Sequence, residues 1–483
     1  MDLKTKTIQG IGWSGISQVV QLLFHFILIA ILARLLTPDD FGLLAMTVVF
    51  TGFVMIFCDF GITAALVQHK RITEEHLSSS FWINILTGFV LTLLLVISAP
   101  LIANFYNESR LTLIISMLSI TFFIHSFGAV QTVLFTRELN FKSLAVAEIL
   151  SVLISGIIAI ILAFSGFGVW SLVWQQLSSI FIKVIFLWKF SNWKPKFLFK
   201  WQRLKELLGF GLNLTGFSFI NYFNRNFDDL LIGKFFGSVS LGFYNLAYQL
   251  LLFPLSNISQ VIGRVMFPSF SIIQNNKDRI SHLYIKATRY IATITFPLMI
   301  GLLVVAPQFI KVVFGLQWER SIFLVQIFAL SGLLHSLGTT VGWIYQSQGR
   351  TDIMFRWGFF SSIIVVTAFI IGLRWNIEGV AVSYAIAGLL LAYPSFAIPF
   401  KLIDLKFGYF VKQFKSISLA TIGMGGTIFT LSVFMNSILG MSDLIILIST
   451  IIIGIISYIS ILFVLDKSFC REIFYLFKQL IKL

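Results

Sequence analysis

Residues 221–248 read NYFNRNFDDLLIGKFFGSVSLGFYNLAY, a stretch in which polar side chains interrupt an otherwise apolar pattern. Asn221, Asn224, Arg225 and Asp228 fall within about 120° of one helix face if each residue advances by about 100°. A charge at the bilayer centre costs roughly 2.5–3.5 kcal/mol, so such a stripe needs water, a partner or a ligand. We expect it to face a hydrated cavity, and a charge cluster at the outer end of a span is the alternative.

The composition of the 483-residue chain is that of a polytopic membrane protein. It is 58% hydrophobic and 11% charged, with a mean hydropathy of +0.93, whereas soluble domains are about one quarter charged. The net charge is +15, but the basic residues lie between apolar segments. This favours a role in membrane topology and anionic-lipid contact, so we expect membrane lipids and no nucleic acid as partners.

Hydropathy divides the chain into fourteen apolar segments, each near the roughly 20 residues that cross a bilayer as a helix. The connecting loops are too short to form a soluble domain. The fold class is therefore expected to be an all-α polytopic membrane protein with about fourteen transmembrane helices. The expected segments are 10–35, 41–66, 79–103, 111–135, 143–164, 168–188, 208–234, 241–266, 289–310, 321–346, 354–373, 377–400, 414–436 and 441–465.

The distribution of lysine and arginine predicts the orientation of these segments. An even number of spans places both termini on one side, and the loops on that side are rich in basic residues. Because such loops stay in the cytoplasm, we expect a multi-pass protein of the bacterial inner (plasma) membrane with both termini cytoplasmic. The opposite loops hold only Arg34, Arg110, Lys234, Lys311, Arg320 and Arg374.

A sequence duplication organises the first twelve segments. ARLLTPDDFGLLAMT (33–47) aligns with GKFFGSVSLGFYNLA (233–247), so that Arg34 matches Lys234. The same offset matches Gln21 with Asn221 and His25 with Arg225. GFGVWSLV (166–173) similarly resembles IEGVAVSY (377–384), and two matches in the same order indicate a repeat of six spans.

We expect four regions along the chain. Two basic stretches, 194–208 and the C-terminus, resemble interfacial helices that could lie on anionic lipid, with ordinary topology-setting charge as the alternative. The regions are an N-terminal six-helix repeat (1–190), a cytoplasmic amphipathic linker (191–205), a C-terminal six-helix repeat (206–402), and two additional helices with a cytoplasmic tail (403–483).

Polar side chains inside the apolar segments make up the candidate site. His125, Glu148 and His335 are expected to be locally hydrogen-bonded or near an interface. The chain lacks GxxxxGK[ST], HExxH, CxxC and GxSxG, so no cofactor or enzymatic site is expected. The candidate substrate-binding residues, with no catalytic or metal-binding residue among them, are Arg225, Asn221, Asn224, Asp228, Asp229, Lys234, Arg34, Gln21, His25 and Asp59.

A family resemblance rests on two stretches. NRNFDDLLIGKFFGSVSLGFYNLAY (224–248) resembles the seventh-span signature of bacterial polysaccharide exporters, and the opening GIGWSGISQVVQLLFHFILIAILARLLTPDDFGLLAMTVVF (10–50) resembles their first-repeat signature. The chain is thus identified as a member of the multidrug/oligosaccharidyl-lipid/polysaccharide flippase superfamily, in the branch of colanic-acid and teichuronic-acid exporters near the O-antigen flippases. The likeness covers the first twelve segments and is less specific beyond Lys401. Asp229 stands where the family more often carries asparagine.

The resemblance implies a V-shaped bundle of two six-helix halves around a central cavity. It further implies a flippase that moves undecaprenyl-diphosphate-linked oligosaccharide units across the inner membrane by alternating access, without an ATPase, for lipopolysaccharide O-antigen or exopolysaccharide synthesis. Arg225, Arg34 and Lys234 would contact the diphosphate, and the asparagines and Gln21 the sugar hydroxyls. The polysaccharide polymerase machinery is a candidate partner. Sugar identity, H⁺ or Na⁺ coupling and oligomeric state stay open.

Three alternatives differ in class. A drug or cation antiporter of the same superfamily would typically stop near twelve spans, so the two extra segments favour the flippase. A membrane polysaccharide polymerase or ligase would need a long periplasmic loop with clustered acids, which the sequence lacks. An inert assembly scaffold would leave the charged stripe without a purpose.

Overall fold

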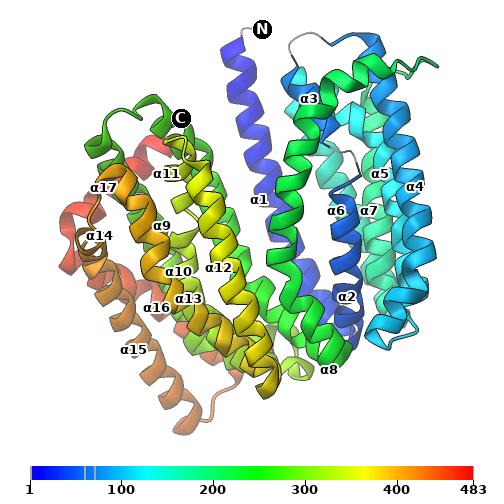
Figure 1. The fold of residues 1–483 in the computed structure, drawn as a ribbon. Coiled ribbons are helices and arrows are strands. Elements are labelled where there is room, and N and C mark those ends of the chain that lie inside the picture. Colours follow the sequence, from blue (N-terminus) through cyan, green and yellow to red (C-terminus); the bar gives the residue numbers. More distant parts are fainter. Residues whose placement is uncertain (1–2, 59–60, 70–71, 482–483) are drawn as a thin grey trace. The chain divides into compact units, whose positions relative to one another are not determined.

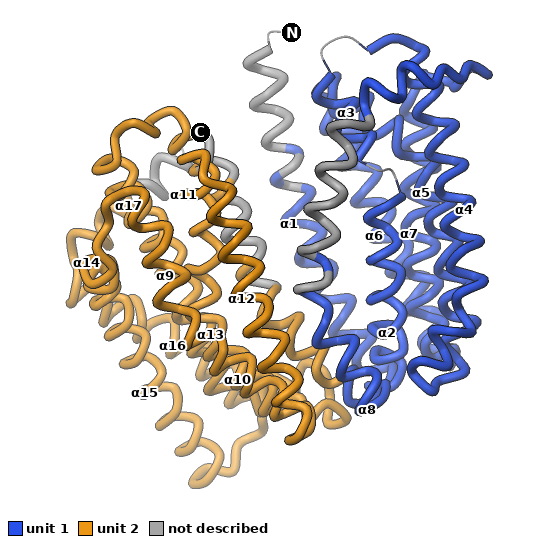
Figure 2. Tube along the Cα trace, in the orientation of Figure 1, with its two compact units in different colours: residues 1–242 blue, residues 243–483 orange. Residues whose placement is uncertain are grey.

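The computed structural model describes the backbone of residues 3–58, 61–69 and 72–481, and most of their side chains outside parts of 3–16, 208–224, 253–268 and 476–481. All regular elements in these residues are helices (Figure 1). The chain forms two compact units, Met1–Gly242 and Phe243–Leu483 (Figure 2). These units follow packing, whereas the predicted repeats follow sequence similarity, so the two divisions need not coincide.

Unit 1 is built from seven helices and the first part of an eighth. Neighbouring helices pair as antiparallel hairpins, with α4 against α5 and α6 against α7, while α1 packs on α6. The helices are α1 (Leu3–Leu35), α2 (Pro38–Met55), α3 (Ile62–Gln68), α4 (Glu74–Tyr106), α5 (Leu111–Arg137), α6 (Phe141–Phe164), α7 (Val169–Phe190) and α8 (Trp201–Ile272), which continues into unit 2.

Unit 2 repeats this style of packing. Helix α9 packs on α10, α15 and α16, and α12 packs on α13. The remaining helices are α9 (Lys277–Phe309), α10 (Ser321–Gly338), α11 (Val341–Ser347), α12 (Thr351–Gly372), α13 (Asn376–Phe400), α14 (Phe407–Lys412), α15 (Lys415–Ser437), α16 (Asp443–Leu465) and α17 (Lys467–Ile481), with short turns of π or 3-10 helix at 310–314, 316–318, 373–375 and 401–403.

Twelve helical stretches in the described residues are long and apolar enough to cross a membrane. One of them, Thr351–Ile403, contains both α12 and α13, which the sequence predicts as separate spans. Two further predicted segments, 208–234 and 241–266, both fall within α8. The chain is an all-helical, multi-pass membrane protein, and the fourteen-span count stays a prediction.

A stripe of small residues explains how α1 docks on α6. Residues four apart lie on one face of a helix, and the buried face of α6 at this spacing carries only Ala or Ser. A Cβ on Gly156 would come within 2.6 Å of the Phe24 ring, so the two helices approach closely, as small residues permit in membranes. The stripe consists of Ala147, Ser151, Ser155, Ala159 and Ala163.

The linker differs from the predicted interfacial helix, because residues 191–200 are not helical and α8 begins only at Trp201. Two buried hydroxyls of α4 accept backbone N–H groups of the linker, Ser78 from Lys196 at 3.1 Å and Ser79 from Lys200 at 2.9 Å. The Trp82 indole donates to the Lys196 carbonyl at 2.8 Å. These bonds hold the segment along α4 in place of intrahelical bonds, so the prediction for this stretch was wrong in its first half.

At the other end of the chain, α17 does form the predicted amphipathic helix. Its inner face is anchored on α9, where Arg289 pairs with Asp466 at 2.7 Å and lies 4.0 Å from the Phe469 ring centroid. Its outer face exposes Phe474 and Tyr475. The helix therefore offers apolar side chains away from the protein core, as an interfacial helix would.

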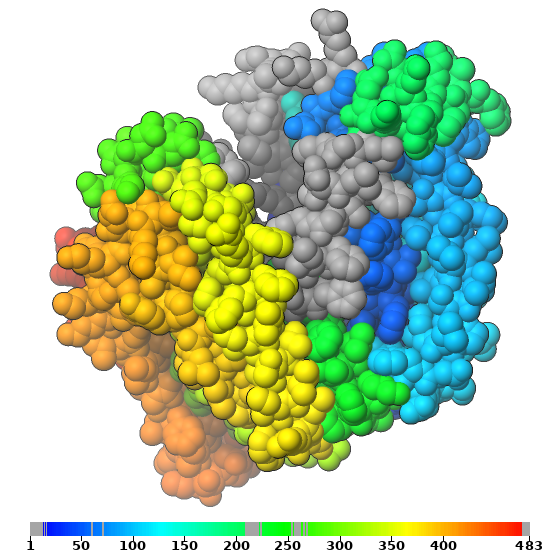
Figure 3. All heavy atoms as spheres, viewed as in Figure 1, coloured from blue at the N-terminus to red at the C-terminus, as the bar shows by residue number. Residues whose placement is uncertain are grey.

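The outer surfaces of the spans are apolar, as a lipid environment requires. Figure 3 shows α12 (yellow) at the surface of one face of the molecule. Its side chains at Phe355, Phe359, Phe360 and Ile363 are each about half exposed. Exposed aromatic and β-branched residues at this density belong to a lipid-facing helix rather than to a solvated one.

Candidate functional site

Two helix junctions contact one another in unit 1, and they are the segments aligned by the sequence repeat. A Cβ built on Gly42 would lie 1.7 Å from the carbonyl oxygen of Ser238, and one on Gly242 would lie 1.9 Å from that of Pro38. Pro38 and Gly42 match Ser238 and Gly242 at the offset of the repeat. The contact is therefore reciprocal, as a pseudo-two-fold relationship between the two segments requires.

The helix start at each junction is built differently. Before α2, the Thr37 backbone and hydroxyl both donate to Asp40, at 2.9 and 2.7 Å, and Pro38 occupies the first turn; this is a capping box. Within α8, the break at the equivalent position is Gly237, with φ 78° and ψ −178°. That backbone conformation is open essentially only to glycine, so the 72-residue α8 is two helices joined at Gly237.

An ionic cluster holds the outer face of the junction. Arg110, in the α4–α5 loop, donates to both carboxylate oxygens of Asp39 at 2.6 and 3.3 Å, and Ser238 donates to the same carboxylate. Arg110 also pairs with Glu108 at 2.7 Å. Its hydrogen bond to Glu108 holds the pKa of that carboxyl below the ordinary range. The cluster ties α2, the α4–α5 loop and α8 together.

Lys234, a predicted diphosphate ligand, contacts the end of α4. Its ammonium group donates to the Phe105 carbonyl and lies 4.9 Å from the Phe105 ring centroid. A cation at the last carbonyls of a helix satisfies acceptors that the helix leaves open and complements its dipole. In this structure Lys234 therefore fastens α8 to the end of α4.

One turn or more towards the start of α8, two tyrosines line the contact with α2 and α4. The Tyr222 hydroxyl donates to the carbonyls of Val48 and Val49, both at 2.9 Å. Asp229 interacts electrostatically with the hydroxyls of Tyr222 and Tyr106. A carboxylate and two phenols thus lie close together in the predicted polar stripe.

A second polar cluster lies inside three candidate spans, α1, α6 and α7. Lys183 pairs with Glu148 at 3.1 Å, and the Gln21 side-chain amide donates to the other Glu148 oxygen at 3.2 Å and to Ser17 at 2.7 Å. Glu148 and Lys183 each sit seven residues from a helix end, or about 10 Å into the span. Their side chains are each 37% exposed, so the pair borders the surface of unit 1 and can be reached.

The predicted site residues fall into distinct places. Gln21 belongs to the cluster with Glu148, while Asp229 and Lys234 lie where α8 contacts α2 and α4. Asp228 is buried and 3% exposed. The side chains of Arg34, His25 and Arg225 are exposed, whereas Asp59 and the side chains of Asn221 and Asn224 lie outside the described residues.

Sequence reasoning missed Lys183 and misjudged Glu148. Glu148 was expected to be isolated, but Lys183 and Gln21 both contact it. A lone lysine and a lone glutamate in successive apolar segments are a detectable signal, because charges within a membrane pair with one another. His125 and His335 do have local partners, the Cys58 thiol at 3.8 Å and the Tyr384 hydroxyl respectively.

Comparison with known families assigns the chain. Residues 31–323, well over half of the sequence, match the family model described as "Polysaccharide biosynthesis protein". This chain belongs to that family. The matched range contains Glu148, Lys183, Arg225 and both helix junctions, whereas Gln21 and His25 precede it.

Curated relatives agree with the assignment. This family member is 32% identical over 356 residues to the teichuronic acid biosynthesis protein TuaB of Bacillus subtilis, covering 73% of the chain and 74% of TuaB. It is 29% identical over 374 residues to the lipopolysaccharide biosynthesis protein WzxC of Escherichia coli K12, covering 77% and 76% of the two chains. The polysaccharide biosynthesis family is one of membrane transporters rather than enzymes.

A solved structure shows that the fold is shared with a known flippase. The lipid II flippase MurJ, in an inward closed conformation, superposes with a TM-score of 0.74 at 17% identity, covering 96% of this family member and 99% of MurJ. At that identity the likeness concerns the fold alone. The chain is therefore an all-helical membrane transporter of polysaccharide biosynthesis with a MurJ-like fold.

Proposed function

We propose that this protein is a flippase that carries undecaprenyl-diphosphate-linked oligosaccharide units across the membrane. The observation that carries the proposal is the Gln21–Glu148–Lys183 cluster inside candidate spans of a polysaccharide biosynthesis transporter. Charged groups inside a bilayer are costly and mark a path for polar cargo. A carboxylate, an ammonium and an amide together can exchange hydrogen bonds with sugar hydroxyls.

The cationic residues on α1 and α8 supply the other half of the chemistry. A diphosphate needs positive charge, which Arg binds with paired N–H donors. Arg225 and Arg34 are exposed, so we propose that they contact the diphosphate. Lys234 already holds the Phe105 carbonyl, and it would have to leave that carbonyl to join them.

The proposal includes the orientation and repeat organisation. We propose fourteen spans, both termini in the cytoplasm, and two six-helix repeats related about the membrane normal, with the remaining two spans outside the repeat. The reciprocal contact of Gly42 with Ser238 and of Gly242 with Pro38 supports the duplication. The central cavity and the alternating access expected from the family resemblance belong to the same proposal.

Deletion of the gene followed by mass analysis of lipid-linked intermediates tests the proposal. A flippase defect leaves complete repeat units attached to their lipid carrier and confined to the cytoplasmic leaflet. Re-expression of the wild-type chain is expected to clear them and restore surface glycan. Accumulation of truncated units, or of none, would contradict the proposed step.

A matched pair of variants tests the cluster within the same strain. Lys183→Gln removes the charge that faces Glu148, whereas Lys189→Gln removes an exposed charge near the end of the same helix. We expect Lys183→Gln to leave complete units uncleared at normal protein levels, and Lys189→Gln to behave as wild type. Equal export by both variants would remove the cluster from the transport path.

A further inference from the structure

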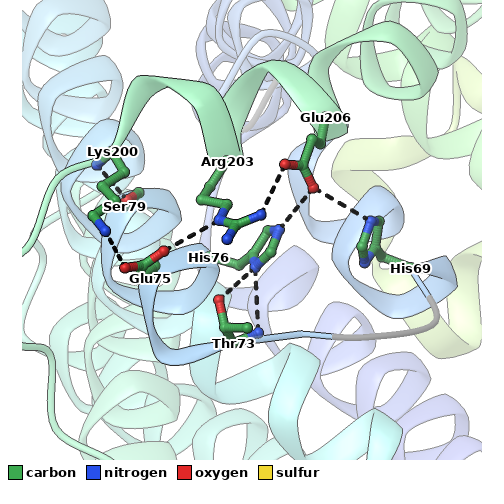
Figure 4. A network of polar contacts seen from close by, with 8 residues as sticks. All are labelled: His69, Thr73, Glu75, His76, Ser79, Lys200, Arg203 and Glu206. Atoms are coloured by element: carbon green, nitrogen blue, oxygen red, sulfur yellow. Dashed lines mark hydrogen bonds and ion pairs between the residues drawn. The ribbon is translucent and has the colours of Figure 1, made fainter.

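A polar network joins the start of α8 to the connection between α3 and α4 (Figure 4). Figure 4 shows that Glu206, in the first turns of α8, points towards the imidazoles of His69 and His76. His69 follows the last residue of α3, and His76 lies in the first turn of α4. Three segments far apart in the sequence thus bring two imidazoles and a carboxylate to one place.

The three ligating atoms lie at distances suited to a metal ion. One Glu206 oxygen, Oε2, is 3.2 Å from Nε2 of His76 and 3.8 Å from Nε2 of His69. All three ligand atoms lie within 4.8 Å of one another. Ligands of tetrahedral zinc, at about 2.0–2.2 Å from the ion, are about 3.4 Å apart. The set therefore needs a contraction on the order of 1 Å at His69 alone.

Residues behind the ligands orient them. Nδ1 of His76 lies 2.8 Å from the hydroxyl and 3.2 Å from the backbone nitrogen of Thr73. Arg203 donates to Oε1 of Glu206 at 3.1 Å, which leaves Oε2 turned towards the histidines. A metal-ligating histidine is held in this way, by a partner on its other ring nitrogen. With a metal at Nε2, the Nδ1 proton would be donated to the Thr73 hydroxyl.

We propose that His69, His76 and Glu206 bind one Zn²⁺ ion, with water in the fourth position. Two imidazoles and one carboxylate are ligands that zinc accepts. The ion would cross-link α8 to the α3–α4 connection, directly beside the linker that leads from the first six helices into α8. The site is separate from the Gln21–Glu148–Lys183 cluster and does not rest on the proposed function.

A hydrogen-bonded network without metal is the competing explanation. In that case Nε2 of His76 carries a proton and donates it to Glu206, which also explains the 3.2 Å separation. It gives no reason for the second imidazole, His69, to stack against the first with ring centroids 5.2 Å apart. The convergence of both rings on one carboxylate oxygen favours the metal.

Metal binding can be measured on the full-length protein, purified through a tag without histidine and reconstituted in lipid nanodiscs after chelation. Zn²⁺ per chain is counted by elemental analysis, and Co²⁺ is titrated while its visible absorption is followed. Wild type is expected to retain one Zn²⁺ and to give the intense bands of four-coordinate cobalt. His69→Asn and Glu206→Gln, both on partly exposed residues, are each expected to weaken binding by more than about tenfold.

The controls separate this site from other histidines and from thiols. His282→Asn changes an exposed histidine on α9, and Cys58→Ser removes the thiol near His125; neither is expected to alter the affinity. His76→Asn is secondary, because His76 is buried and caps α4. Wild-type protein without bound Zn²⁺, or binding that survives both His69→Asn and Glu206→Gln, would overturn the proposal.

Discussion

The two contacting junctions, 37–42 and 237–242, reach the same backbone arrangement with different side chains. The first begins α2 with a capping box and binds Arg110 through Asp39. The second has only Gly237 to break the helix, and Val239 stands where Asp39 would be. Both keep a glycine, Gly42 or Gly242, at the close approach. Duplicated segments thus retain what the backbone contact requires, while the helix-starting chemistry diverges.

Replacing either contact glycine should have the largest effect. Gly42→Ala and Gly242→Ala each place a methyl group within 2 Å of a carbonyl oxygen, so the helices must separate at a cost of about 3 kcal/mol or more. We expect a similar loss of folded protein and of thermal stability in both. Gly358→Ala, at a helical glycine with open space, is the control. A tolerated change at one of the two sites would break the reciprocity.

Gly237 should matter for conformation rather than for space. A Cβ there would meet nothing within 4 Å, but φ is 78°, and a side chain in that region costs about 1–3 kcal/mol. We therefore expect Gly237→Ala to lower the unfolding temperature by less than Gly42→Ala does. Fluorescence-monitored thermal unfolding of the two purified variants, side by side, measures the order. The reverse order would show that the break at Gly237 is not strained for alanine.

Loss of the cap at the first junction should be milder. Thr37→Ala removes the hydroxyl that bonds Asp40, and losing an N-cap costs about 1 kcal/mol. Thr37→Ser keeps the hydroxyl and should restore wild-type unfolding. If Thr37→Ala and Thr37→Ser unfold at the same temperature, the capping box does not hold the start of α2.

The Arg110 cluster should contribute least. Its groups are partly exposed, so Arg110→Gln is expected to cost under about 1 kcal/mol, with a smaller penalty at high salt. A thermal-unfolding series in rising salt measures the difference between the two proteins. A penalty that is larger than that of Thr37→Ala would mean that the cluster holds the junction more firmly than the cap does.

The same cluster predicts a pH dependence. Because the bond from Arg110 lowers the folded-state pKa of Glu108, its contribution is complete above the ordinary glutamate pKa of 4.5 and is lost as the pH falls through the lowered value. Wild type should therefore lose stability below pH 4.5 more steeply than Arg110→Gln. Parallel curves for the two proteins would contradict this assignment.

Sequence patterns predicted the helical membrane fold and the matched segments, because hydropathy and short alignments are local signals. They did not predict that residues 191–200 run along α4, since that path depends on the hydroxyls of Ser78 and Ser79 in a distant helix. Nor did they pair Glu148 with Lys183, which are 35 residues apart in sequence. Lys234 was correctly singled out as a membrane-edge cation, but only packing identifies the Phe105 carbonyl as its partner.

The central claim, that the chain flips a lipid-linked oligosaccharide, is tested most directly by reconstitution. Purified protein in liposomes with labelled undecaprenyl-diphosphate oligosaccharide should expose inner-leaflet substrate to an added, impermeant glycosidase. Wild type and the control Arg374→Ala are expected to make substrate accessible beyond the outer-leaflet share, whereas Arg225→Ala is expected to leave it at that share. Inactive wild-type protein would contradict the flippase function, and full activity of Arg225→Ala would contradict the role of the α8 stripe.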